Sequence, residues 1–264
     1  MTPTRTLPPL LRVGHPVADR AILVGDPGRA LALAQVLLAR PPLMSNHARG
    51  LWGYTGTASD DAPLSVLSTG TGGPSAAAVL REAVDAGVRR VVRAGSAVPA
   101  GPGVAPPGPG GRGADPTEEP AEEPAASDAA TGPSSAPAAL RAVSFAVSHD
   151  GTSAALGRSP GEEVRPDGGL LDRLRGLGLR ETGVVSVDLL PADGGPPPPL
   201  HRGAGAVDRQ SAAVLAAAER LGVPAAVVLA FPHADEEEEA RGAWWRAVGL
   251  AAAAALGVEA VARD

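Results

Sequence analysis

The stretch AILVGDPGRALALAQVLLA, residues 21–39, predicts a β-strand, a tight turn and an α-helix in direct succession. The four apolar residues 21–24 have the length of a short buried strand, and Gly-Asp-Pro-Gly at 25–28 ends it because these residue types favour turns. Residues 30–39 are rich in Ala and Leu, which favour a helix. A strand that leads directly into a helix is the repeating unit of a parallel sheet covered by helices.

The same alternation continues along the chain. Strands are predicted at residues 53–57, 64–67, 90–93, 140–147, 184–189 and 225–231, and helices at 74–86, 169–177, 207–221 and 235–256. The helix at 74–86 begins with Pro74 and is followed by Gly87, which is typical of the two ends of a helix. We therefore predict an α/β protein with one domain, in which helices flank a mixed, largely parallel sheet in three layers.

Residues 99–139 interrupt this pattern. They contain ten Pro, seven Gly and no aromatic residue, and the run TEEPAEEPAASD at 117–128 is acidic. Such a segment buries too little apolar surface to offset the entropy that is lost on ordering. We expect a disordered insertion at 99–139 within a single domain that spans residues 1–264.

Composition excludes several classes of chemistry. A chain of 264 residues can bury a sizeable core, but with three Trp, one Tyr and two Phe this core must consist of Ala, Val and Leu. All 23 basic residues are Arg, which excludes a Walker-type phosphate loop and Schiff-base catalysis because both need Lys. Cysteine is absent, which excludes disulfides, thiolate metal sites and a Cys nucleophile.

Charge and hydropathy bear on partners and location. The net charge is −6 and no basic block is present, which argues against binding to nucleic acid. The N-terminus has no apolar run of signal-peptide length, and the apolar run at 248–256 is too short to span a bilayer. No set of His, Asp and Glu has metal-ligand spacing. We expect a soluble cytoplasmic protein that associates with neither membranes nor metals.

Three loops at the carboxyl ends of predicted strands are suited to anions. They are GDPGR at 25–29, STGTGGPS at 68–75 and RAGS at 93–96. Glycine lets backbone N–H groups approach an anion, a helix N-terminus adds a favourable dipole, and an Arg can bind phosphate with two parallel hydrogen bonds. Each loop alone is most simply a turn or a surface Arg, but together they fit the ligand crevice of an open α/β sheet.

These motifs, with ARGLWGYTGT at 48–57, resemble the purine nucleoside and uridine phosphorylase family in order and spacing. HDGTSAAL at 149–156 and AVDRQSAAVLAAAERLGVPAA at 206–226 are similar to later stretches of that family. The resemblance implies a phosphorylase/hydrolase-like fold, with a mixed, distorted sheet surrounded by helices. It also implies cleavage of a nucleoside's N-glycosidic bond by phosphate, or by water in the nucleosidase branch.

The resemblance assigns a phosphate site residue by residue. Gly25 and Arg29 match the family's phosphate-binding Gly and Arg, and Arg93 and Ser96 match its second Arg and the hydroxyl beside it. Arg49 matches an Arg that reaches the phosphate of a neighbouring subunit, which implies a homo-oligomer, either a dimer or a hexamer. Inorganic phosphate would be a co-substrate, the nucleoside the other substrate, and no cofactor is implied.

The sugar side departs from the family pattern. Arg209 and Gln210 stand where the family has Met-Glu, and Gln210 keeps the shape of the Glu but loses its charge. Arg209 could pair with an anionic group of the substrate, or it could turn to solvent or pair with Asp208 in a decayed site. Thr71 and Gly72, in the loop after residue 67, are assigned with Gln210 and Arg209 to the sugar and base.

Helical spacing predicts which of these two side chains meets the sugar. If residues 207–221 form one helix, Gln210 lies on the same stripe as Val214, four residues on, and faces the cleft. Arg209 lies about 100° away around that helix. We therefore expect Gln210 rather than Arg209 to face the sugar.

The base side departs as well. His233 stands where the purine branch has an Asp that protonates the leaving base, so His233 is either a general acid, acting with Arg93 in catalysis, or an ordinary loop histidine. His201 and Arg202 are weak substitutes for the residues with which the uridine branch binds uracil.

The function expected is phosphorolytic cleavage or formation of an unusual nucleoside. Two alternatives stay open: a catalytically silent homologue that binds a nucleoside or nucleotide, and a nucleosidase that uses water. The retained residues Arg29, Arg93 and Ser96 count against the nucleosidase.

Overall fold

The computed structural model of the protein describes residues 9–39, 41–100, 140–199, 201–231 and 238–258. Its strands are β1 (Arg20–Val24), β2 (Leu43–Asn46), β3 (Gly53–Thr57), β4 (Pro63–Ser68), β5 (Arg90–Ser96), β6 (Val98–Pro99), β7 (Leu140–His149), β8 (Glu163–Val164), β9 (Arg180–Val187), β10 (Ala204–Asp208) and β11 (Ala225–Ala230). Its helices are α1 (Pro27–Leu37), α2 (Gly73–Asp85), α3 (Gly151–Ala155), α4 (Gly168–Gly176), α5 (Ser211–Leu221) and α6 (Glu238–Ala255), with 3-10 turns η1 (Ala48–Gly50) and η2 (Pro191–Asp193).

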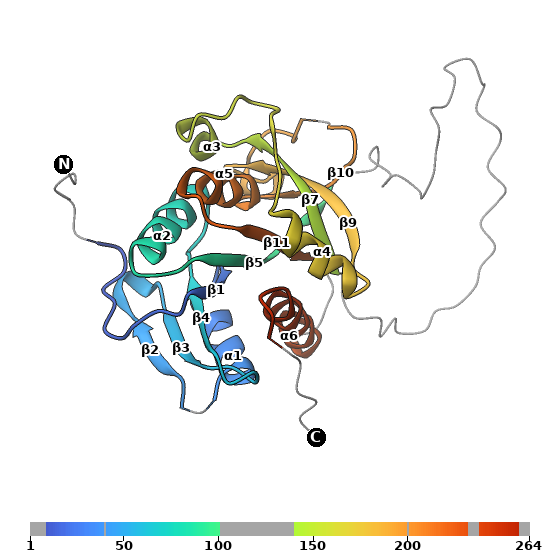
Figure 1. The fold of residues 1–264 in the computed structure, drawn as a ribbon. Coiled ribbons are helices and arrows are strands. Elements are labelled where there is room, and N and C mark those ends of the chain that lie inside the picture. The colour runs from blue at the N-terminus through green and yellow to red at the C-terminus, as the bar shows by residue number, and fades with distance from the viewer. Residues whose placement is uncertain (1–8, 40, 101–139, 200, 232–237, 259–264) are drawn as a thin grey trace, which may run out of the picture.

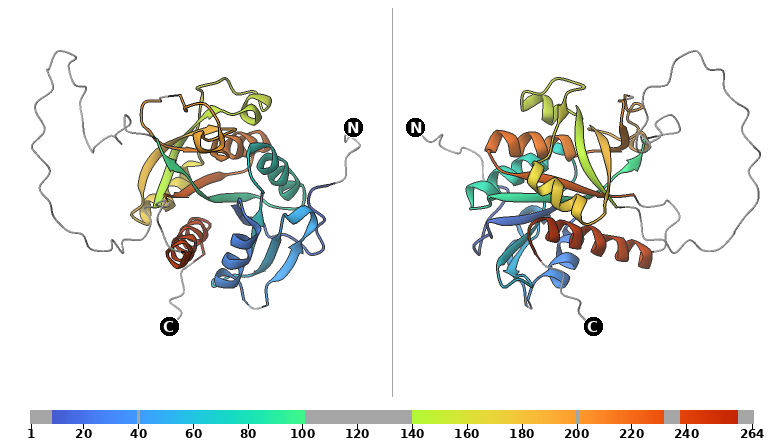
Figure 2. Two further views of the ribbon diagram at one scale, coloured as in Figure 1. Left: turned by 180° about the vertical axis from the view of Figure 1, so that it is seen from behind. Right: turned by 45° about the vertical axis from the view of Figure 1, so that its right-hand side comes forward.

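The strands form one eleven-stranded mixed sheet in the order β2-β3-β4-β1-β5-β11-β7-β9-β10-β6, with β8 beside β7 (Figure 1). Strands β4, β1, β5 and β11 run parallel to one another, whereas β7 joins β11 in antiparallel fashion and starts a second parallel group with β9 and β10. Only Ala97 separates β5 from β6, which pairs with β10. Strand β10, at the far side of the second parallel group, therefore lies beside the segment that directly follows β5, and it ends near β5 (Figure 2).

Helices cover both faces of the sheet, as the alternation of strands and helices predicted. One core layer packs α1, α4 and α6 against the sheet, and a second packs α2 and α5 against the opposite face (Figure 1). Neighbouring residues of β1 contribute to different layers, since Ile22 belongs to the first and Leu23 to the second. Ala, Val and Leu dominate both layers, and the predicted three-layer α/β fold is confirmed.

The predicted helix at 207–221 is wrong at its beginning. Val207 and Asp208 are the last two residues of β10, and α5 begins at Ser211. Strand β10 is stabilised by pairing with β9 and β6, which are distant in sequence, and the helical spacing of Val207 is therefore coincidental. Strand β5 also runs through Gly95 and Ser96 instead of stopping before them, and the short elements β2, β6, β8 and α3 were not predicted.

The first two residues of the predicted insertion at 99–139 belong to the described fold. Pro99 lies in β6 opposite Ala206, and the N–H of Ala100 donates to the carbonyl oxygen of Gly205 at 3.1 Å. Residues 101–139, and the start of the predicted closing helix at 235–237, lie outside the described residues. None of the helices that the structure describes is long and apolar enough to cross a membrane.

Candidate active site

A cleft of about 470 Å³ opens where β1, β4, β5 and β10 end. The three predicted anion loops, residues 25–29, 68–75 and 93–96, all contribute to its wall. Ligand sites of open α/β sheets lie at such strand ends. The following sequence-predicted site residues line it together: Gly25, Arg29, Thr71, Gly72, Arg93, Ser96, Arg209 and Gln210.

Arg29 lies in the first turn of α1, directly after the GDPG turn. The carboxylate of Asp26 caps this helix and accepts the N–H of Arg29 at 2.8 Å. The guanidinium lies over the ring of Trp245 in α6, with its Cζ 3.5 Å from the ring centroid. Burial lowers the pKa of Arg29 and nearby Arg93 lowers it further, while Asp26 opposes both effects. Within the described part of the chain the guanidinium forms no ion pair.

Arg93 is the buried cation of the cleft, with 5% of its surface exposed. Its guanidinium forms an ion pair with Asp208 at 3.1 Å and donates to the amide oxygen of Gln210 and the hydroxyl of Ser211 at 3.3 Å. Burial lowers the pKa of Arg93, and the charge of Asp208 opposes this. The motif needs Gly95 because a Cβ there would lie 2.6 Å from the guanidinium carbon of Arg93.

Asp208 is a site residue that the sequence analysis missed as a partner of Arg93. Besides the ion pair, its carboxylate accepts the hydroxyls of Ser186 and Ser211 at 2.6 and 2.7 Å and the N–H of Gln210 at 3.3 Å. The predicted helix at 207–221 includes Asp208, whereas the structure places this residue at the end of β10. The signal that could have found it is the Asp-x-x-Ser pattern ahead of an apolar run, which is typical of a residue that caps a helix.

Gln210 connects two walls of the cleft. It is the residue before α5, not a member of the predicted helical stripe, and its side chain is buried. Its amide oxygen accepts from Arg93, while its amide nitrogen donates to the carbonyl oxygens of Gly70 and Gly72 at 2.7 and 3.1 Å. The amide therefore joins β5 to the loop after β4, and it lies on the wall of the cleft as predicted, although for a different reason.

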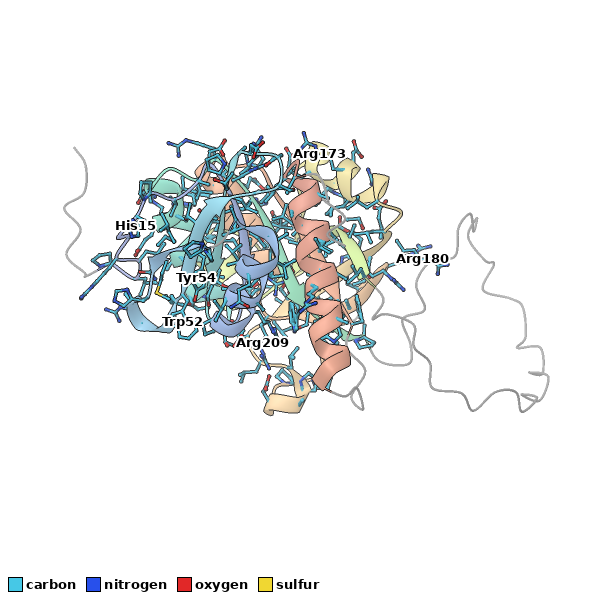
Figure 3. All side chains as sticks on the ribbon, turned by 90° about the horizontal axis from the view of Figure 1, so that it is seen from below. His15, Trp52, Tyr54, Arg173, Arg180 and Arg209 are labelled. Carbon is cyan, nitrogen blue, oxygen red and sulfur yellow. The ribbon has the colours of Figure 1, made fainter. Side chains whose placement is uncertain are left out.

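Arg209 is paired with a carboxylate other than that of its neighbour Asp208. Its guanidinium forms an ion pair with Asp193 in η2. Figure 3 shows Arg209 beside this turn, below the strand ends. Both side chains are partly exposed, and the hydrogen bond from Arg209 lowers the pKa of Asp193.

Two residues named from the sequence, Arg49 and His201, do not line the cleft of their own chain. Arg49 is exposed in η1, where it adopts a left-handed backbone conformation with φ of 56°, and it is not among the residues that line the cleft of its own chain. His233 lies outside the described residues. His201 packs its ring against Phe145, with centroids 5.6 Å apart, and does not line the cleft.

The three Arg residues that line the cleft differ in whether a carboxylate neutralises them. Arg93 is paired with Asp208 and Arg209 with Asp193, whereas Arg29 stacks on an uncharged ring. Within the described residues, Arg29 is therefore the cleft guanidinium that has no carboxylate partner and can donate to an anion. In the part of the chain that is described, no three His, Cys, Asp or Glu residues are grouped so that they could hold a metal ion.

The mixed sheet, its helical layers and this cleft define a phosphorylase/hydrolase-like α/β protein. The structure is similar to uridine phosphorylase from Vibrio fischeri ES114, with a TM-score of 0.66 at 16% sequence identity over 97% of this chain and 98% of that chain. A second structure of that enzyme, complexed with 6-hydroxy-1-naphthoic acid, gives 0.66 at 17% identity over 92% and 93% of the two chains.

Sequence comparison points to the same group of proteins. The chain is 38% identical to the DeoD-type purine nucleoside phosphorylase of Oceanobacillus iheyensis over 81 residues, which is 30% of this chain and 34% of that protein. It is 42% identical to the DeoD-type enzyme of Streptococcus uberis over 87 residues, or 33% of this chain and 35% of that protein. No model of a known protein family matches the chain. The chain is related to the nucleoside phosphorylases, as its motifs predicted, and the match spans about a third of the length of these curated relatives.

Proposed function

We propose that the protein cleaves or forms the N-glycosidic bond of a nucleoside, with inorganic phosphate as the second substrate and no cofactor. The observation that carries this proposal is Arg29, whose guanidinium has no carboxylate partner among the described residues and lines a cleft where three strand-end loops meet. Relationship to the nucleoside phosphorylases supports the same reaction class.

In this mechanism phosphate binds among Gly25, Arg29, Arg93 and Ser96, which share one wall of the cleft. Arg29 supplies charge-assisted hydrogen bonds and Ser96 a neutral one, so that the phosphate loses water and is aimed at the anomeric carbon. As the base departs, the sugar gains positive charge, and the phosphate's own negative charge stabilises it. Arg93 orients the phosphate and adds little net charge, because Asp208 balances it.

On the sugar side we propose Thr71, Gly72, Gln210 and Arg209 as the contacts. A neutral amide at Gln210 gives less stabilisation to a developing cation than a carboxylate would, so we propose an unusual nucleoside as the natural substrate. Protonation of the leaving base is assigned to His233, which lies outside the described residues.

A catalytically silent homologue that binds a nucleoside or nucleotide is the second candidate. The observation that favours it is the state of Gln210, whose amide oxygen and nitrogen already have protein partners in Arg93, Gly70 and Gly72. A sugar hydroxyl would have to compete with these partners. A nucleosidase is disfavoured, because water needs no counterpart to Arg29 and Ser96.

We also propose a homo-oligomer, a dimer or a hexamer, in which Arg49 reaches the cleft of a neighbouring subunit. Its exposure, and its absence from the cleft lining of its own chain, support this arrangement. A single chain would then hold an incomplete phosphate site.

The test is turnover of a nucleoside panel with and without inorganic phosphate, following release of the base and of pentose 1-phosphate. Phosphate-dependent release that is lost in Arg29→Ala supports the phosphorylase. Release that is independent of phosphate identifies a nucleosidase, and binding without turnover identifies the silent homologue. Arg81→Ala is a matched control, because Arg81 is an exposed residue of α2 that pairs with Asp85 far from the cleft lining.

A further inference from the structure

Helices α1 and α6 approach each other closely beside the cleft (Figure 3). A Cβ at Gly249 of α6 would overlap with the side chain of Leu33 in α1, so the absence of a side chain at 249 permits this approach. Arg29 lies one turn before Leu33, and Trp245 lies one turn before Gly249. The same helix contact that needs Gly249 therefore brings Arg29 against Trp245.

The guanidinium of Arg29 lies over the ring of Trp245. The Cζ of Arg29 lies 3.5 Å from the ring centroid of Trp245, which is 8% exposed. Trp244 packs against the same indole, with ring centroids 4.3 Å apart, and lies farther from the guanidinium, at 6.0 Å. A stacked indole attracts a cation through its π-electrons and leaves the guanidinium N–H donors free, because those donors point outward in the plane of the group.

Arg93 shows the alternative arrangement. Its donors are directed at Asp208, Gln210 and Ser211, which hold the group in place but occupy its hydrogen-bonding capacity. Arg29 is held without such partners among the described residues, and its guanidinium lines the cleft.

We propose that Trp245 is a positioning residue that holds Arg29 by its face, so that its free donors bind inorganic phosphate in the cleft. This inference rests on the proposed phosphate site. It adds the C-terminal helix α6 to the machinery of that site, although Trp245 itself touches no substrate. An aliphatic residue at 245 would fill much of the same volume but would not attract the cation, and Arg29 could then swing into solvent.

The experiment measures affinity for inorganic phosphate by calorimetry in the full-length protein. Trp245→Leu is expected to weaken binding by about three- to tenfold, while Trp245→Phe, which keeps an aromatic face, stays within about threefold of the wild type. Trp52→Leu is the matched control, because the rings that Arg29 lies over, among the described residues, are those of Trp244 and Trp245, and it should leave the affinity unchanged. In an Arg29→Ala background, Trp245→Leu should cause no further loss, since its effect acts through Arg29.

Each outcome separates the inference from the proposed function. If Arg29→Ala leaves phosphate affinity unchanged, the proposed phosphate site is wrong and the inference falls with it. If Arg29→Ala weakens binding but Trp245→Leu does not, or if Trp245→Leu weakens it equally without Arg29, only the positioning role is overturned. If Trp245→Leu does not fold, the inference is tested instead by the fluorescence emission of Trp245 in the double variant Trp52→Phe/Trp244→Phe, where Trp245 is the remaining Trp. That emission should shift on addition of phosphate, and an unchanged spectrum overturns the inference.

Discussion

Arg93 and Gln210 are joined by two hydrogen bonds, because Nε and Nη2 of the guanidinium both donate to the same amide oxygen, at 3.4 and 3.3 Å. The amide nitrogen of Gln210 donates in the opposite direction, to the carbonyl oxygens of Gly70 and Gly72. A side-chain amide can accept from a cation and donate to carbonyls at the same time, whereas a carboxylate only accepts. Glutamine at this position is therefore suited to a structural connection between β5 and the loop after β4.

Gly95→Ala is expected to remove Arg93 from its site. The added Cβ would lie 2.6 Å from the guanidinium carbon, so Arg93 must leave Asp208 and its other partners. Leaving Asp208 buried without its cation should lower the free energy of unfolding by about 3–5 kcal/mol, measured by urea denaturation. Gly176→Ala is the control, because no atom lies within 4 Å of a Cβ there, and it should be neutral or slightly stabilising. Equal stability of the two variants would contradict the close approach of Arg93 to Gly95.

Asp60→Asn is expected to change stability in a pH-dependent way. Both carboxylate oxygens accept from Arg20 at 2.6 Å, and these hydrogen bonds lower the pKa of Asp60 to about 2 from its usual 3.8. A depressed pKa means that the ionised carboxylate stabilises the fold above about pH 4, and that this contribution is lost as the pH falls through about 2. Because solvent screens the partly exposed carboxylate, the variant should lose about 1 kcal/mol at pH 7.

The measurement is urea denaturation of the wild type and of Asp60→Asn at pH 7, 4 and 2.5. The difference in the free energy of unfolding between the two proteins should become smaller toward the lowest pH. Asp61→Asn serves as the control, since Asp61 has a left-handed backbone conformation that Asn also adopts readily. If this difference in the free energy of unfolding stays constant from pH 7 to 2.5, the ion pair between Arg20 and Asp60 does not cause it.

That the four residues proposed to bind phosphate lie together could be predicted from the sequence, and the reason is topological. Gly25, Arg29, Arg93 and Ser96 lie at or just after the ends of β1 and β5, and neighbouring parallel strands end at the same edge of a sheet. Local motifs that mark strand ends therefore suffice to bring these residues together. The strand-end motifs predicted that these loops meet in one cleft, and the family resemblance named the residues within them.

The partners that control these residues could not be predicted in the same way. Asp208 reaches Arg93 because β10 pairs with β6, and this pairing depends on how the later strands return toward β5. Local spacing instead favoured a helix over the last residues of β10. Trp245 reaches Arg29 through the packing of α1 against α6, which are far apart in the sequence. Both contacts depend on tertiary structure. Strand pairing overrides the local helical spacing at Asp208, and helix packing brings Trp245 to a residue that no local sequence pattern connects with it.

Arg49 is expected to act across a subunit contact. Each of the variants Arg29→Ala and Arg49→Ala, measured separately, should bind phosphate more weakly than the wild type. In a mixed dimer, one of the two sites would combine an intact Arg29 with an intact Arg49, so random mixing should restore about a quarter of the wild-type sites. Calorimetry on the mixture, refolded together from denaturant, measures this recovery. No recovery, or a stable monomer in sedimentation at micromolar concentration, would contradict the role across subunits.

Gln210→Glu is expected to lower stability and to raise turnover of ordinary nucleosides. The new carboxylate cannot donate to Gly70 and Gly72, and the loss of a donor to these carbonyls should cost about 1–3 kcal/mol in urea denaturation. Repelled by the two carbonyl oxygens, the carboxylate turns toward the cleft, where it can stabilise positive charge on the sugar. Since one such electrostatic contact commonly changes a rate by about a hundredfold or more, turnover of inosine or uridine should rise at least about tenfold. Gln210→Met separates the two effects, because it loses the donor to Gly70 and Gly72, and the acceptor for Arg93 as well, without gaining a charge. It should be destabilised without becoming faster. If the wild type already cleaves inosine or uridine rapidly and Gln210→Glu slows it, the amide that bridges Arg93 to the glycine loop is itself part of an adapted catalytic site.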